Sequence, residues 1–98
     1  MSDETRQQVI VYWADAHADG EGSWTPLAEL TDNGEYIVES VGFLLTASDG
    51  GKAGHVSLAQ SITPDDMADH IIHIPQGMVR SMQILEGNLS LHLDTPPL

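Results

Sequence analysis

The sequence lacks cysteine, so disulfide bonds and thiolate chemistry are excluded as sources of stability or activity. It also lacks any apolar run approaching the ~18 residues that a membrane-spanning helix needs. The first residues, MSDETRQQ, are polar, so the sequence predicts no secretory signal. Its 98 residues are enough for one small domain with a modest core. We therefore expect a single intracellular domain over residues 1–98, frayed at residues 1–5 and 95–98.

Basic residues are scarce: Arg6, Lys52 and Arg80 face fifteen acidic residues, for a net charge of −12. Nucleic-acid binding draws its affinity from Lys and Arg that neutralise phosphates, and binding to anionic membranes depends on the same residues. Direct binding to nucleic acid or to a membrane is therefore not expected. The acidic surface either keeps a small protein soluble or meets a basic protein partner.

Catalytic motifs are also missing. There is no G-x-S-x-G segment and no glycine-rich loop that precedes a helix, and Gly50-Gly51-Lys52 is too short to hold a phosphate. The adjacent acids Asp65 and Asp66 lie in a predicted turn, where hydrated surface carboxylates are expected. The sequence predicts no enzymatic activity and no cofactor.

The segment Ile71–Leu85 is the most informative part of the chain. Its first apolar run must end at Pro75, which has a fixed φ and no N–H for a strand ladder. We expect Gly77 to supply the backbone freedom for a tight turn. The second apolar run then follows directly, so the pattern predicts two strands joined by one 3₁₀ turn.

The rest of the chain reads as further short strands separated by turn signals. Gly42 lies inside one of them and predicts a bend or a bulge. The strands are predicted over residues 6–14, 35–47, 53–62, 67–74, 79–85 and 89–93.

A long loop over residues 15–34 separates the first two predicted strands. Within it a short helical turn is expected at Pro26–Leu30, with Thr25 as its N-cap. We expect the apolar residues Trp24, Leu27 and Leu30 to anchor this loop to the rest of the domain.

This order of elements resembles the SH3-like and Sm-like small barrels. It predicts a mainly β fold of five to six antiparallel strands, with a long first loop and a short 3₁₀ turn before the fifth strand. Both faces of residues 6–14 are apolar, and leucines alternate over residues 89–93. These two features predict a homo-oligomer.

Two patterns of metal-ligand residues are incomplete. In the first, acids and a histidine recur from Asp15 as in a calcium loop, but position twelve is Pro26 and not the bidentate glutamate. In the second, His70 and His73 lie on one predicted strand, where their side chains point to opposite faces, so they are expected to be polar cross-strand neighbours. A site shared between subunits would need a third ligand that the sequence does not place. No metal site is therefore predicted.

The remaining candidates are binding residues. Arg80 is expected to pair with an acid such as Asp69 or Glu39, or else to line an anion pocket together with His73. The acidic and aromatic residues predicted to contact a partner are Asp15, His17, Asp19, Glu21, Trp24, Asp65, Asp66 and Asp69.

Four blocks of the sequence resemble a group of small phage and prophage proteins of unassigned function. They are VYWADAHA (11–18), SVGFLL (40–45), HVSLAQS (55–61) and IPQGMVRSMQIL (74–85). The group's usual features are a Trp-acid step, a glycine in the second strand and an Ile-Pro-x-Gly corner, which here fall at Trp13 and Asp15, Gly42, and Ile74-Pro75-Gly77. The resemblance implies a phage origin and action in the host cytoplasm, and it brings no catalytic residues.

The sequence thus predicts a phage accessory protein that acts as an acidic protein-binding module. Its target would be a basic or nucleic-acid-binding host protein that it inhibits. Two alternatives stay open: an oligomeric binder of a small ligand such as a signalling nucleotide, and a structural protein of the virion.

Overall fold

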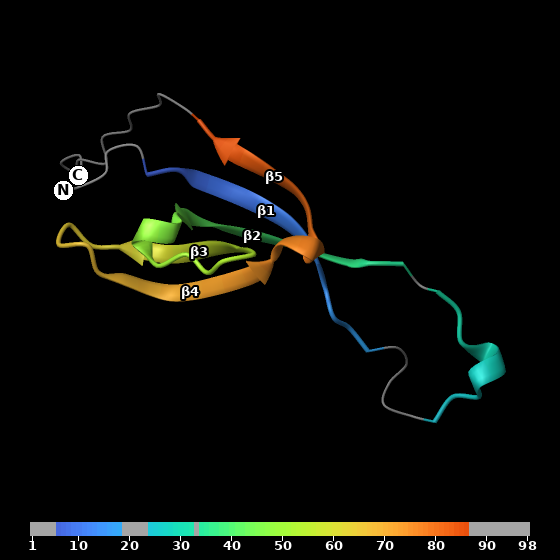
Figure 1. Cartoon of the computed structure of the whole chain (residues 1–98). Coiled ribbons are helices and arrows are strands. Elements are labelled where there is room, and N and C mark those ends of the chain that lie inside the picture. The colour runs from blue at the N-terminus through green and yellow to red at the C-terminus, as the bar shows by residue number, and fades with distance from the viewer. Residues whose placement is uncertain (1–5, 19–23, 33, 87–98) are drawn as a thin grey trace, which may run out of the picture.

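A computed structural model describes residues 6–18, 24–32 and 34–86 of the chain. Five antiparallel strands form one open sheet in the order β4-β3-β2-β1-β5 (Figure 1). The described residues contain three 3₁₀ turns and no α-helix. The mainly β prediction is confirmed. The elements are β1 (Gln8–Asp15), η1 (Leu27–Glu29), β2 (Tyr36–Leu45), η2 (Ala47–Asp49), β3 (His55–Ile62), β4 (Ala68–Pro75), η3 (Gln76–Met78) and β5 (Val79–Leu85).

The five strands agree with their predicted positions to within two residues at each end, and β5 agrees at both. The sixth predicted strand, over residues 89–93, lies outside the described residues. Among the described strands β4 and β5 are the two edges of the sheet and do not pair with each other. The sheet is therefore open, and a closed barrel stays a prediction.

The core lies between the two halves of the curled sheet. Strand β1 is hydrogen-bonded on both sides, to β2 and to β5, which places Val9 and Val11 at its centre with no exposed surface. They pack with Leu58 of β3 and Ile74 of β4. This cluster is completed by partly buried side chains from four strands: Trp13, Leu44, Val56 and Val79.

The corner between β4 and β5 confirms the prediction of two strands joined by a single 3₁₀ turn. Pro75 is the last residue of β4, and η3 follows at once. The backbone N–H of Gln76 donates to the carbonyl oxygen of Gly54 at 3.0 Å, which ties the corner to the turn before β3. The reason given for Gly77 was wrong. Its φ is not positive, and a Cβ at this position would meet nothing within 4 Å.

Gly42 was predicted to mark a bend or a bulge, but the structure gives another reason for a glycine at this position. The pairing of β1 with β2 continues past it without a shift of register. A Cβ on Gly42 would lie 2.8 Å from the carbonyl oxygen of Ala59 and 3.2 Å from the Cβ of Leu58. Glycine is thus required here because β2 and β3 approach closely. The register shift of the sheet lies elsewhere, at Tyr12 and Trp13 opposite β5.

Residues 16–35, which we call the arm, connect β1 to β2, and the described part of the arm projects away from the sheet (Figure 1). The long first loop is therefore confirmed. Its helical turn is shorter than predicted: Pro26 precedes η1 with an extended ψ of 137°, and the turn has no side-chain cap. Thr25 is not its N-cap, because Pro26 occupies the capping position and has no side-chain oxygen.

Candidate functional site

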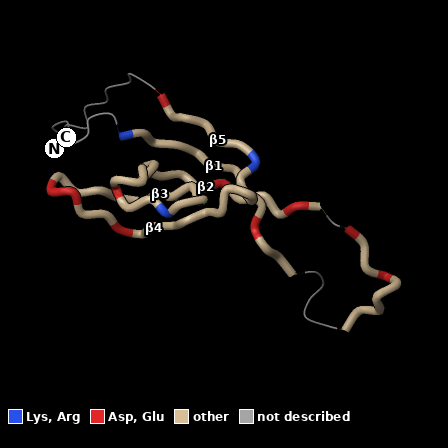
Figure 2. The backbone as a smooth tube through the Cα atoms, viewed as in Figure 1, with Lys and Arg blue, Asp and Glu red and all other residues tan. Residues whose placement is uncertain are grey.

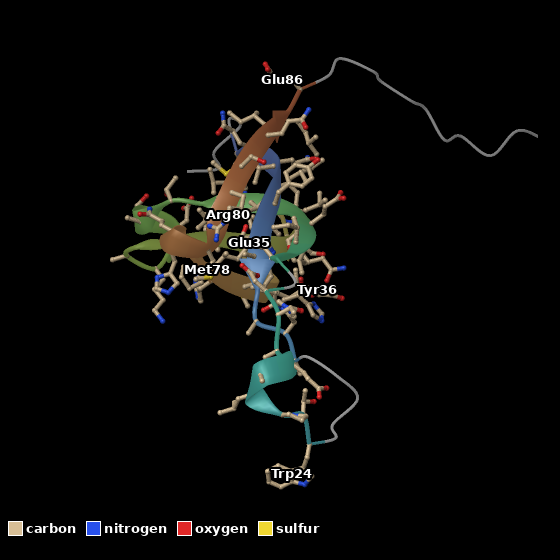
Figure 3. The ribbon with its side chains drawn as sticks, turned by 90° about the vertical axis from the view of Figure 1, so that its right-hand side faces the viewer. Trp24, Glu35, Tyr36, Met78, Arg80 and Glu86 are labelled. Atoms are coloured by element: carbon tan, nitrogen blue, oxygen red, sulfur yellow. The ribbon has the colours of Figure 1, made fainter. Side chains whose placement is uncertain are left out.

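The arm exposes the apolar side chains that were expected to anchor it. Trp24 is fully exposed, Leu27 is 85% exposed and Leu30 is 50% exposed. Figure 3 shows Trp24 at the far tip of the arm, pointing away from the sheet. The anchoring prediction was wrong because the arm leads these side chains away from the core. Burying an apolar side chain of this size contributes about 1.5–3 kcal/mol of favourable free energy. The exposed side chains of the arm can therefore contribute to the binding of a partner protein.

The arm is also acidic along its length. Residues 16–35 contain five acids and no Lys or Arg. Three of the acids, Glu29, Asp32 and Glu35, belong to the described part and follow the arm in Figure 2. The apolar residues of the arm thus belong to a stretch of sequence that contains acids and no Lys or Arg.

An ion pair holds the end of the arm that joins β2. The Nε of Arg80 donates to Oε1 of Glu35 at 2.7 Å, and Nη2 of Arg80 donates to Oε2 of the same carboxylate (Figure 3). The remaining Nη1 donates to the carbonyl oxygen of Gly77 at 2.9 Å. The hydrogen bonds from Arg80 lower the pKa of Glu35. One guanidinium therefore links the arm, the 3₁₀ corner and β5.

The predicted partners of Arg80 were Asp69 or Glu39, and both assignments were wrong. The structure pairs Arg80 with Glu35, the residue just before β2. The two residues meet only in the folded protein, and charge alone does not reveal which acid is selected.

Local contacts shape the described parts of the arm. The backbone N–H of Ala16 donates to Oδ1 of Asp15, and the N–H of Gly34 donates to Oδ1 of Asp32, each at 2.8 Å. The rings of His17 and Tyr36 lie with their centroids 5.7 Å apart. Each of these contacts joins residues that are close in the sequence or involves the start of β2. They therefore order the part of the arm near the sheet and do not cover its tip.

The predicted partner-binding residues divide between two ends of the molecule. Asp15, His17 and Trp24 lie at or in the arm, whereas Asp19 and Glu21 fall outside the described residues. The other three acids lie in the turn between β3 and β4 or just after it, at the opposite end of the sheet in Figure 1: Asp65, Asp66 and Asp69.

Each acid at the β3–β4 end has a local partner. The hydroxyl of Thr63 donates to Asp65 at 2.6 Å and lowers the pKa of that carboxyl. Asp66 lies 3.5 Å from Nη2 of Arg6, and Asp69 lies 3.1 Å from Nδ1 of His70. This second group of acids therefore supports the turn and the start of β4, and it is not continuous with the arm.

The two residues predicted to line an anion pocket make different contacts. Arg80 is engaged by Glu35, as described above. His73 places Nδ1 2.6 Å from Oγ of Ser57 on the neighbouring strand β3. Ser57 is only 1% exposed, so its hydroxyl positions the histidine ring and is not accessible to a substrate.

No family model matches the chain, and no curated protein or solved structure is significantly similar to it. Within the described ranges, no helix has the length and apolar character required to cross a membrane.

From the sequence, Trp24 was predicted to be among the partner-binding residues, but Trp24, Leu27 and Leu30 were also expected to anchor the loop. A signal that distinguishes the two roles was present: both leucines stand in a 20-residue stretch with five acids and no base.

Proposed function

We propose that this protein is a non-enzymatic phage accessory factor that binds a basic protein of the host cytoplasm through its arm. The observation that carries the proposal is the full exposure of Trp24 on a segment that contains acids and no bases. Within this proposal, Trp24, Leu27 and Leu30 provide the apolar contact, and the acids around them select the partner.

Protein interfaces concentrate their binding energy in a few residues, and tryptophan is enriched among them. An aromatic side chain buries about 150–250 Å² when it enters a pocket. Carboxylates around such an anchor speed association with a basic surface and exclude acidic partners, with strong dependence on salt. A host protein that binds nucleic acid presents a surface of this kind, so occupancy by the arm would block its nucleic-acid site.

The same features favour a protein over an anionic small ligand. A nucleotide needs cationic groups for its phosphates, and the arm has none. Arg80, the base nearest to the arm in the described part, already gives two hydrogen bonds to Glu35. This arrangement supports the binding-module proposal over the signalling-nucleotide alternative.

Affinity purification from expressing bacterial cells, followed by mass spectrometry, tests the proposal. The full chain, Trp24→Ala and Met67→Ala are compared at low salt; Met67 is 64% exposed in the β3–β4 turn and is the matched control. We expect a basic protein that is captured by the parent and by Met67→Ala, lost with Trp24→Ala, and released by salt. The purified partner must then bind the purified chain directly. Equal capture by all three chains, or the absence of a salt-sensitive partner, would contradict the proposal.

We further propose that the chain is a homo-oligomer and that its curled sheet is an SH3-like or Sm-like barrel. The two edge strands, β4 and β5, are consecutive in the sequence and are joined only by η3. This connection is the one expected between the last two strands of such a barrel. Met82 and Ile84 of β5 pair with Val11 and Val9, so they share the face of the sheet that forms the core. Each is nevertheless 44% exposed. A second copy packed against the edge strand β5 would bury the exposed part of these two side chains.

Light scattering on a sizing column tests the oligomer. Met82→Glu should shift the protein toward a monomer, because a carboxylate replaces a side chain buried between copies. Met67→Glu, with the same substitution at another exposed methionine, should not. A monomeric parent protein at micromolar concentration would overturn the proposal.

A further inference from the structure

Two histidines that are far apart in the sequence lie side by side on β3 and β4. Ser57 pairs with His73 and His55 pairs with Pro75, so both imidazoles project from the same face of the sheet. Their ring centroids are 6.4 Å apart, and the rings are nearly perpendicular at 86°. The sequence had singled out another pair, His70 and His73.

That other pair is not brought together. His70 has a φ of 49°, which interrupts the regular strand, and its Nδ1 faces the carboxylate of Asp69 at 3.1 Å. His73 instead has Ser57 as its cross-strand neighbour. Register across the sheet, and not spacing along the chain, decides which histidines meet.

Both rings are held through the same nitrogen. Nδ1 of His55 lies 2.8 Å from the carbonyl oxygen of Ala53, which can only accept, so Nδ1 carries the proton and Nε2 keeps its lone pair. Nδ1 of His73 lies 2.6 Å from Oγ of Ser57. This hydroxyl is buried and also accepts a hydrogen bond from the backbone N–H of Lys52 at 3.0 Å. When His73 donates to it, Nε2 of His73 is free as well.

We propose that His55 and His73 bind one divalent transition-metal ion through their Nε2 atoms. Imidazole is a preferred ligand of Zn²⁺, Ni²⁺ and Cu²⁺. Metal-binding histidines characteristically donate their other ring N–H to a carbonyl or a similar acceptor. The carbonyl of Ala53 is such an acceptor for His55, and the hydroxyl of Ser57 is one for His73 in the tautomer whose Nδ1 carries the proton. The net charge of −12 further favours a cation.

The site has two protein ligands, with water completing the coordination. Within the described ranges no three His, Cys, Asp or Glu side chains form a metal-binding group. A pocket of about 250 Å³ adjoins His55 and is lined in part by Gln76 and Lys52; His73 does not line it. Two ligands imply a weaker site than the four-ligand sites that stabilise whole folds.

A Zn²⁺ titration of the full chain in excess Mg²⁺ tests the proposal, because Mg²⁺ occupies the carboxylate sites that prefer hard cations. We expect saturable binding of one ion per chain, with NMR shifts of the ring resonances of His55 and His73 together. His55→Gln and His73→Gln should each weaken binding about tenfold or more. His70→Gln is the matched control and should leave it unchanged.

With Cu²⁺ as the probe, the electron paramagnetic resonance spectrum should show coupling to two imidazole nitrogens in the parent. Either substitution should reduce this to one. Circular dichroism of each variant checks the fold; if His73→Gln unfolds because Ser57 loses its partner, His55→Gln still decides the question. No saturable binding at millimolar Zn²⁺, ring resonances that do not move, or equal affinity in the His55 and His70 variants would overturn the proposal.

Discussion

Apolar side chains are buried in the core of the sheet and exposed in the arm. In β1, β3 and β4 the core residues Val9, Leu58 and Ile74 are at most 2% exposed. In the arm, Trp24 and Leu27 have almost all of their surface in water. The arm follows β1 directly in the chain, and its apolar side chains are nevertheless not packed against the sheet. The sheet does not require the apolar residues of the arm, which is why we assign them to a partner.

The largest expected difference between the sheet and the arm is the loss of stability when a core side chain is removed. Leu58→Ala should lower the free energy of unfolding by about 2–5 kcal/mol, because Leu58 is 2% exposed and its loss leaves a cavity among Val9, Val11 and Ile74. Leu27→Ala, the same substitution in the arm, should change it by no more than about 0.5 kcal/mol. Urea denaturation measures both. Similar losses in the two variants would mean that the arm is part of the core.

Trp24→Ala gives the opposite pattern. The stability should stay within about 0.5 kcal/mol of the parent, since the side chain touches solvent only. Affinity for the partner protein should fall by about 30-fold or more, as expected for an interface hot spot worth at least about 2 kcal/mol. Titration calorimetry with the purified partner measures this loss. Unchanged affinity would exclude Trp24 as the anchor.

The close approach of β2 and β3 can be tested by adding a methyl group. Gly42→Ala places a Cβ against the carbonyl oxygen of Ala59 and should destabilise the fold by about 1–3 kcal/mol. Gly77→Ala, in the corner, has open space and an ordinary φ, so it should be neutral or stabilise by less than about 1 kcal/mol. Thermal denaturation distinguishes them. A larger loss for Gly77→Ala would restore the turn-glycine interpretation of the corner.

The smallest effect is expected where the arm meets the sheet. The pKa of Glu35 is lowered in the folded protein by the hydrogen bonds from Arg80, relative to an ordinary value of 4.5. The ion pair therefore adds stability above that ordinary value, and the contribution is lost as the pH falls through the lowered pKa. Glu35→Gln should be slightly less stable than the parent near neutral pH, and the difference should vanish in acid.

The matched control for this prediction is Glu29→Gln, which removes one negative charge from the arm away from Arg80. Thermal melts of the three proteins across the acid range measure the effect. A stability difference between Glu35→Gln and the parent that grows as the pH falls would contradict the assigned sign.

The sequence predicted the strands and the 3₁₀ corner well because both follow from local rules. Alternating apolar residues and Pro75 specify where β4 ends and β5 begins, whatever surrounds them. Three predictions failed because they depended on what lies across the fold. Trp24, Leu27 and Leu30 are apolar, but apolar character does not say what covers a side chain. Arg80 pairs with Glu35, and His73 meets His55, only in the folded protein, because the residues of each pair come from different parts of the chain.

The chain has one tryptophan in each region, and their fluorescence tests the division between sheet and arm most directly. Trp13 packs against the core and donates a hydrogen bond from Nε1 to Oγ of Ser40 at 2.9 Å, whereas Trp24 is fully exposed. Acrylamide quenching is measured on Trp13→Phe, which reports Trp24, and on Trp24→Phe, which reports Trp13. We predict that Trp24 is quenched as readily as free tryptophan and becomes protected when the partner binds, while Trp13 resists quenching throughout. Equal protection of the two tryptophans in the unbound protein would contradict the account.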